Sequence, residues 1–238
     1  MVDRSMRQAL LTALDAIARP EGVMARAVTN RKWGIALALV AAATMFGAAA
    51  MSARLDARPA ALTALEQEGK LHDATDRDIA EATQKEQRLT TAKLLGVALV
   101  QPWISAALLT LGIALGAWLV AARLSWGAAW VIACHALLPQ AIKNVIAGAA
   151  ALSRSSLSLS AARDLVAASA APLFHGPFAH LAAQLDLFAI WSALLVAFGV
   201  AAVARTPRPR CIAIALAGLG CWAALLFSIS NGGSHHGA

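Results

Sequence analysis

Five polar side chains lie in otherwise apolar stretches of the sequence and are the first candidates for chemistry: His135, Gln140, Lys143, Asn144 and Asp186. A charged group at bilayer depth is costly unless it is paired or reaches an interface. Asp186 is the partner expected for Lys143, because the long lysine stem bridges the offset between the two positions. The pair either fixes helix packing or, with His135, forms part of a proton or ion path. One acid and one histidine are few for a relay, so the sequence favours structural pairing.

Histidines and acidic residues of the predicted outer face and tail are a second set of candidates, as metal ligands: His72, Asp73, Asp76, Asp78, His175, His180, His235 and His236. Imidazole and carboxylate are suitable metal ligands, but the spacing of these residues matches no known ligand pattern. The sequence also contains no HExxH, GxSxG, phosphate-binding GxxxxGKS or GxxxxGKT, or GxGxxG after a strand. We therefore expect no catalytic residue, no metal site and no cofactor; a membrane enzyme with an outer-face site is the weaker alternative.

The composition predicts a helical membrane protein. Hydrophobic residues make up 59% of the chain and charged residues only 14%, against about 25% charged in soluble proteins. The apolar residues are concentrated in runs, which cross a bilayer as helices because lipid offers no partner for backbone polar groups. The net charge of +7 comes from arginines beside these runs, with no basic stripe or nucleic-acid motif. We expect an all-α integral membrane bundle that binds no nucleic acid.

The apolar runs predict five transmembrane helices. The predicted spans are 33–51, 94–122, 126–152, 180–204 and 211–230. Together they form a membrane domain over 33–230, preceded by a cytoplasmic N-terminal segment (1–32) and followed by a flexible Gly/His tail (231–238). Within the first segment, an amphipathic helix over 5–19 ends at Pro20 and lies either on the membrane surface or against the bundle.

Residues 52–92 form the only sizeable polar segment, in which acidic and basic side chains nearly balance. Pro59 stands where a helix is expected to start, and Gly69 where it is expected to end. Thr75 followed by Asp78 is a weak capping box. It predicts a second helix that runs on into the next span.

Basic residues in the short connections predict the orientation. Arg31 and Lys32 precede the first span, Arg123 separates the second from the third, and Arg205, Arg208 and Arg210 follow the fourth. With five spans these residues share one side, and Lys and Arg favour the cytoplasm. The N-terminus is then cytoplasmic. Segment 52–92, a Ser-, Ala- and Pro-rich loop over 153–179, and the C-terminus are outside.

Small residues predict close packing between the spans. Gly112 and Gly116 form a GxxxG pattern on the second span, which allows two helix backbones to approach. Gly199 has the same interpretation on the fourth span. Pro102 predicts a kink in the second span, which is longer than a straight crossing needs.

Two stretches resemble spans of the Yip family, the Ypt/Rab-interacting polytopic membrane proteins. The stretch LDLFAIW, which contains Asp186, Phe188 and Trp191, resembles the fourth span of that family. The stretch that ends in HALLP at Pro139 resembles the third span, with its aromatic start and late proline. The resemblance covers residues 17 to 230 and implies a five-helix membrane domain with a cytoplasmic N-terminus. The eukaryotic relatives bind partners in vesicle traffic.

This chain departs from the family in its short N-terminal segment and its long, charged segment 52–92. The family has many bacterial members, and the Ala- and Arg-rich composition is typical of a GC-rich bacterium. We therefore expect a protein of the bacterial cytoplasmic (inner) membrane.

The sequence predicts a non-enzymatic membrane scaffold or transport accessory subunit. We expect it to bind another membrane protein, such as an ABC exporter, or a second copy of itself, through segment 52–92, because a surface with both signs of charge suits protein–protein recognition. The alternative is a small transporter or channel that uses His135, Lys143 and Asp186. No inverted repeat supports that alternative.

Overall fold

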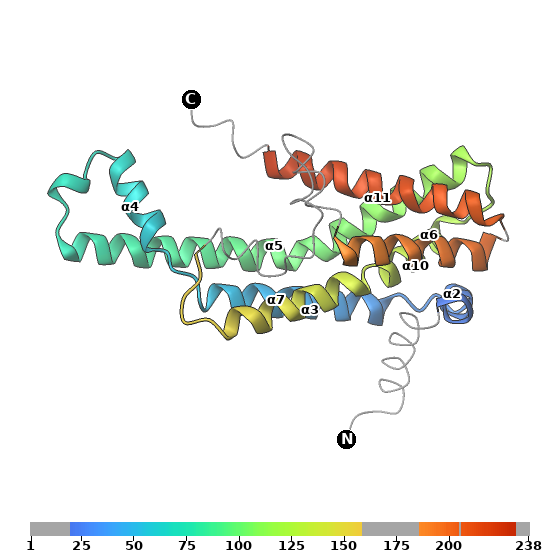
Figure 1. The fold of residues 1–238 in the computed structure, drawn as a ribbon, viewed down its shortest axis with the longest axis horizontal. Coiled ribbons are helices and arrows are strands. Elements are labelled where there is room, and N and C mark those ends of the chain that lie inside the picture. Colours follow the sequence, from blue (N-terminus) through green and yellow to red (C-terminus); the bar gives the residue numbers. More distant parts are fainter. Residues whose placement is uncertain (1–19, 159–185, 205, 232–238) are drawn as a thin grey trace, which may run out of the picture. The chain divides into compact units, whose positions relative to one another are not determined.

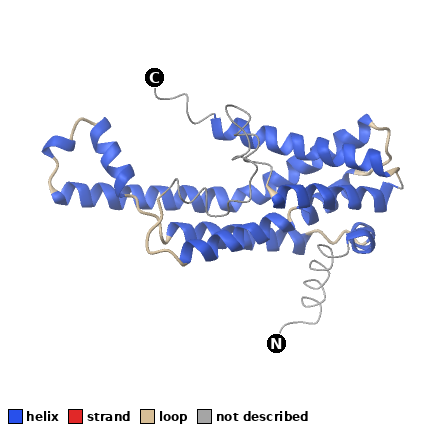
Figure 2. Cartoon of the chain, viewed as in Figure 1, coloured by secondary structure: helices blue, strands red, loops and turns tan. Residues whose placement is uncertain are grey.

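A computed structural model describes residues 20–158, 186–204 and 206–231, and within these ranges the chain is all-α (Figures 1 and 2). In chain order the elements are α2 (Pro20–Thr29), α3 (Gly34–Ser52), α4 (Arg58–Gln67), the short 3-10 helix η1 (Leu71–Asp73), α5 (Asp76–Leu119), α6 (Trp126–Ala136), α7 (Leu138–Leu152), α10 (Leu187–Ala204) and α11 (Arg208–Asn231). The predicted helix 5–19, the 153–179 loop from residue 159 on, and the tail from residue 232 lie outside the described residues.

Among the described residues, four helical stretches are long and apolar enough to cross a membrane: α3, α5, α6 with α7, and α10. This confirms the predicted class, a helical integral membrane protein. In the α6–α7 stretch, 67% of the most apolar 18 residues are buried inside the protein. In each of the other three stretches this share lies between 33% and 39%. The fifth predicted span falls within α11, a helix of 24 residues. That α11 crosses the bilayer, and which side each terminus faces, stay predictions.

The chain forms two compact units. Of the described residues, unit 1 contains 20–40, 102–141, 186–204 and 206–231, and unit 2 contains 41–101 and 142–158. In unit 1, α10 packs against α11, α6 and α2, and its core includes Ile132, Leu195 and Ile214.

Helix α2 gives Pro20 a role that was not predicted. Pro20 begins this helix, which continues to Thr29. Proline is well placed in a first helical turn, where its missing N–H has no intrahelical partner to lose. Met24 and Ala27, one turn apart, are both buried as α2 packs on α10 and α6.

The polar part of unit 2 begins with α4. The predicted boundary residues of this helix, Pro59 and Gly69, are both confirmed. Pro59 lies in the first turn of α4. Gly69 has a positive φ of 69°, a conformation that glycine adopts without a Cβ clash. The N–H groups of Gly69 and Lys70 donate to the carbonyls of Glu66 and Leu65. These two bonds form a Schellman motif that ends the helix.

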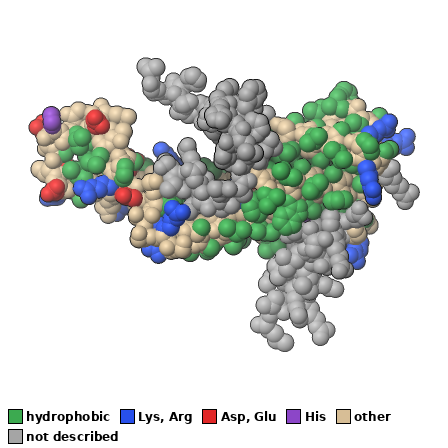
Figure 3. Space-filling model, viewed as in Figure 1, with side chains coloured by type: hydrophobic (Ala, Val, Ile, Leu, Met, Phe, Trp, Pro, Cys, Tyr) green, Lys and Arg blue, Asp and Glu red, His purple; other side chains and the backbone are tan. Residues whose placement is uncertain are grey.

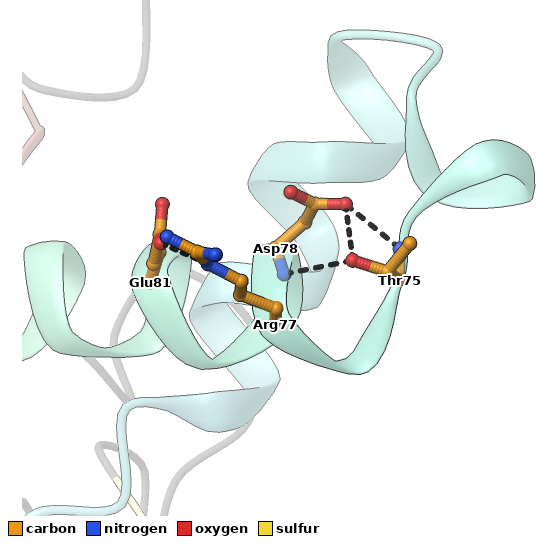
Figure 4. A network of polar contacts seen from close by, with 4 residues as sticks. All are labelled: Thr75, Arg77, Asp78 and Glu81. Carbon is orange, nitrogen blue, oxygen red and sulfur yellow. Dashed lines mark hydrogen bonds and ion pairs between the residues drawn. The ribbon is translucent and has the colours of Figure 1, made fainter.

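The capping box at the start of α5 is also confirmed (Figure 4). The Asp78 carboxylate accepts hydrogen bonds from the Thr75 backbone N–H at 2.9 Å and from the Thr75 hydroxyl at 2.6 Å. The Asp78 N–H donates to Thr75 Oγ1 at 3.3 Å. From this cap, α5 continues for 44 residues through Pro102, and Figure 1 shows it as one long helix.

The third predicted span consists of two helices. It divides at Leu137, between α6 and α7. Pro139 in the first turn of α7 explains the division, because its ring has no N–H and crowds the carbonyl four residues earlier, that of His135. Pro139 is fully buried, so the break lies inside the protein.

Candidate functional site

His135 is buried in α6 and bonded to its own helix. Its side chain is 3% exposed, and Nδ1 lies 2.9 Å from the Val131 carbonyl oxygen one turn earlier. A carbonyl only accepts, so Nδ1 must be the protonated nitrogen in this contact. Only Nε2 is then left for other chemistry.

Asp186 lies at the beginning of α10 and not two turns inside a span. The predicted fourth span starts at residue 180, whereas α10 begins at Leu187, with residues 180–185 outside the described part. Asp186 Oδ1 accepts a hydrogen bond from the Ala189 N–H at 2.7 Å. This is an N-cap, a position that aspartate favours because the carboxylate satisfies a helix N–H and lies at the positive end of the helix dipole. The Asp186 side chain is only 3% exposed.

Asn144 joins α7 to α3 within unit 2. Its Nδ2 donates to Thr44 Oγ1 at 3.0 Å, across 100 residues of sequence. Small residues bring the two helices together: a Cβ on Gly47 would lie 2.9 Å from the Asn144 carbonyl oxygen, and one on Gly148 would lie 2.7 Å from the Phe46 ring. Thr44 could not be predicted from the sequence, because a single threonine in an apolar run carries no pairing signal.

The five predicted polar residues are divided between the two units. His135, Gln140 and Asp186 belong to unit 1, and Lys143 and Asn144 belong to unit 2. The Lys143–Asp186 pair stays a prediction. His135 bonds to a carbonyl of its own helix, α6, and the Asp186 carboxylate accepts from an N–H in the first turn of α10.

Gln140 lines a small cavity in unit 1 together with two residues that the sequence analysis did not select, Ser192 and Trp222. The cavity has a volume of about 10 Å³ and is lined by Leu109, Leu137, Gln140, Ser192, Ala193, Val196, Ala215, Leu219 and Trp222. These residues come from α5, α7, α10, α11 and the α6–α7 break. Neither Ser192 nor Trp222 gives a sequence signal, since single serines and tryptophans are common in membrane spans.

Glycines allow helix backbones to approach in unit 1. A Cβ on Gly112 would lie 2.7 Å from the Gly218 Cα, and one on Gly116 would lie 3.0 Å from the Ile214 Cα. The GxxxG of α5 therefore lies directly against α11. On α10, a Cβ on Gly199 would lie 2.9 Å from a methyl carbon of Ile132 in α6.

The polar part of unit 2 presents a groove with both signs of charge. The groove has a volume of about 930 Å³ and is lined by Arg58, Asp76, Arg77, Ile79, Ala80, Glu81, Thr83, Gln84, Gln87 and Arg88. Arg77 and Glu81, one helical turn apart, form an exposed ion pair at 3.0 Å. Figure 3 shows acidic and basic side chains close together over α4 and the start of α5.

The hydrogen bonds at the start of α5 also affect the pKa of Asp78. The hydroxyl and the backbone N–H of Thr75 hold the pKa of the Asp78 carboxyl below its ordinary value, because both bonds favour the charged form. The cap therefore depends on ionised Asp78.

Unit 1 carries a purely basic set of exposed side chains where α3, α6 and α11 begin and α5 ends: Arg31, Lys32, Arg123, Arg208 and Arg210. Tryptophans accompany them at the same helix ends. Trp118 and Trp126 are exposed, and Trp33 packs edge-on against Trp130 with ring centroids 6.1 Å apart. Basic and tryptophan side chains together are typical of a membrane–water interface on the cytoplasmic side.

Comparisons with protein-family models, curated proteins and solved structures find no match. The resemblance to the Yip family stays a prediction from the residues quoted above.

Proposed function

We propose that this chain is a non-enzymatic membrane scaffold or accessory subunit that binds another membrane protein through its outer polar segment, α4 to the first turns of α5. The membrane in this proposal is the bacterial cytoplasmic membrane, with the N-terminus in the cytoplasm. The partner class is a transporter such as an ABC exporter.

The length of α5 is the observation that carries the proposal. At a rise of about 1.5 Å per residue, its 44 residues extend about 66 Å. The hydrocarbon core of a bilayer is about 30 Å thick. A helix more than twice that length must continue well beyond the core, and its polar residues up to Lys93 identify the projecting part. The membrane span and the polar surface thus belong to one continuous helix.

Several hydrogen bonds hold the projecting part in place within unit 2. Gln87 of α5 donates from its side chain to the Ser52 carbonyl at the end of α3, at 3.0 Å. The backbone at Arg54 and Asp56 exchanges hydrogen bonds with Leu157 at 2.8 and 2.9 Å. A segment tied down in this way offers a preformed surface, which lowers the ordering cost of binding.

The groove of this segment suits a protein surface. Arg58, Arg77 and Arg88 line it together with Asp76 and Glu81. Mixed charge selects a partner of complementary pattern, because like charges that face each other across an interface are repelled.

The experiment is affinity purification of the intact protein in a gentle detergent, with mass spectrometry of what accompanies it. We compare the native chain with Arg88→Glu, which reverses a charge in the groove. Lys85→Glu is the matched control, because Lys85 is exposed on the same helix and does not line the groove. The proposal predicts a stoichiometric membrane partner with the native chain and the control, and a several-fold loss with Arg88→Glu.

Equal recovery of the partner with Arg88→Glu and with Lys85→Glu would show that the groove does not bind the partner. Recovery of the chain alone would contradict the proposal itself. Flux measurements would then test the transporter alternative: Lys143→Ala should abolish transport while leaving a folded protein.

A further inference from the structure

Three polar atoms in unit 1 are buried and have no hydrogen-bond partner among the described residues: Gln140 Nε2, Ser192 Oγ and Trp222 Nε1. Ser192 is 6% exposed and Trp222 is 9% exposed. A bilayer supplies no partner for such groups, so each unsatisfied one raises the free energy of the folded state. Buried polar groups in native proteins are nearly always bonded, to protein or to ordered water.

The three atoms belong to residues that line the same cavity. Their side chains come from three helices, α7, α10 and α11, and reach the cavity of about 10 Å³ described above. A volume of about 10–15 Å³ on this measure is what one water molecule needs. The rest of the lining, including Leu109 and Val196, is apolar. A void lined only by such residues would stay dry, whereas two to four polar groups are what a buried water requires.

The chemistry of the three groups defines the ligand. The Trp222 indole only donates, and Gln140 Nε2 also only donates, so neither can satisfy the other. The Ser192 hydroxyl both donates and accepts. A group that satisfies all three atoms must therefore accept one hydrogen bond from each of the two N–H groups. It must also donate a hydrogen bond to the Ser192 hydroxyl or accept one from it. Water does this, and a metal cation, which would face two N–H donors, does not.

We propose that a single water molecule occupies this cavity and hydrogen-bonds Gln140, Ser192 and Trp222. It links α7, α10 and α11 at the level of the α6–α7 break, since Leu137 lines the same cavity. The water completes the hydrogen bonding of unit 1 where Pro139 prevents a continuous helix. This role does not depend on the proposed scaffold function.

The test is water-edited solid-state NMR of the full chain in lipid bilayers, with ¹⁵N-labelled tryptophan side chains. The Trp222→Phe variant assigns the Trp222 indole signal by its disappearance. We expect magnetisation to pass from water to the Trp222 indole N–H, although this residue is buried. Ser192→Val, which replaces the hydroxyl by a methyl group and adds a second methyl group at the cavity, should abolish the transfer. Ser105→Ala, a change at a buried serine that does not line the cavity, should leave it intact.

The native chain alone can overturn the proposal. If exposed Trp118 receives magnetisation from water and the Trp222 indole N–H does not, the cavity holds no water. A high-resolution density map would also contradict the proposal if a protein group filled the cavity and accepted a hydrogen bond from the Trp222 indole N–H. Neither result depends on whether a variant folds.

Discussion

The Thr75–Asp78 cap is the residue-scale feature with the clearest physical consequence. Asp78 accepts two hydrogen bonds from Thr75, and its pKa is lowered by them. A carboxyl whose pKa is lower in the folded state contributes stability that is fully present above its unfolded pKa, about 3.9. That contribution is lost as the pH falls through the lowered folded pKa.

We therefore predict that Asp78→Asn makes the amide protons in the first turn of α5 exchange several-fold faster near pH 6. The difference from the native chain should shrink below about pH 3.9 and vanish once Asp78 of the native chain is protonated. Hydrogen exchange read by mass spectrometry measures both effects. Glu81→Gln, one turn further along, is the control, because it removes an exposed ion pair and leaves the cap intact. A pH-independent difference would contradict this electrostatic account.

A second residue-scale prediction concerns the bond between Asn144 and Thr44. A double-mutant cycle of Asn144→Leu and Thr44→Val, measured by unfolding in detergent, should give a coupling energy of about 0.6 kcal/mol, with about 1.7 as the upper bound. Additive effects of the two changes would show that the 3.0 Å contact contributes nothing.

Residue types predicted local features better than long-range contacts. The cap at Thr75 and the helix end at Gly69 follow from patterns within a few residues, and both are confirmed. The partner of Asn144 is 100 residues away, and the cap formed by Asp186 depends on where α10 begins. Neither can be inferred from spacing, because tertiary packing decides which of several polar residues meet.

At the scale of elements, the close approach of α5 and α11 gives the sharpest prediction. Gly112→Ala should destabilise the protein by about 1–3 kcal/mol, the usual cost of overpacking, because the new Cβ would meet the Gly218 backbone. Gly96→Ala, in the same helix and with nothing within 4 Å of its Cβ, is the matched control. It should be neutral or slightly stabilising, since alanine is the better helix former. Thermal unfolding in a fixed detergent compares the two, and equal effects would contradict the packing argument.

Helix boundaries show where sequence reasoning reaches its limit. The apolar runs predicted the positions of the membrane helices, because hydrophobic length is set by the bilayer. They did not predict α2, nor the division of 126–152 at Leu137. Proline is favourable in the first turn of a helix but interrupts a helix further along. The roles of Pro20 and Pro139 can therefore be inferred only once the neighbouring elements are known.

At the scale of the whole molecule, the proposed topology rests on the length of α5 and the basic helix ends. A cysteine at Ala80 should react with a membrane-impermeant maleimide in intact cells, because the proposed topology has that position outside. A cysteine at Ser125, beside Arg123, should react only after the membrane is opened. Native cysteines give little background, as Cys134 and Cys211 are buried and Cys221 is half-buried. The reverse pattern would invert the orientation.

The central claim, that the outer groove of α5 binds another membrane protein, is tested most directly by site-specific photo-crosslinking in living cells. A crosslinking residue at Gln84 lies in the groove, and one at Leu99, on the same helix, is exposed on the apolar part. The account predicts one defined membrane-protein adduct from Gln84 and none of that identity from Leu99. No adduct from Gln84, or the same adducts from both positions, would contradict it.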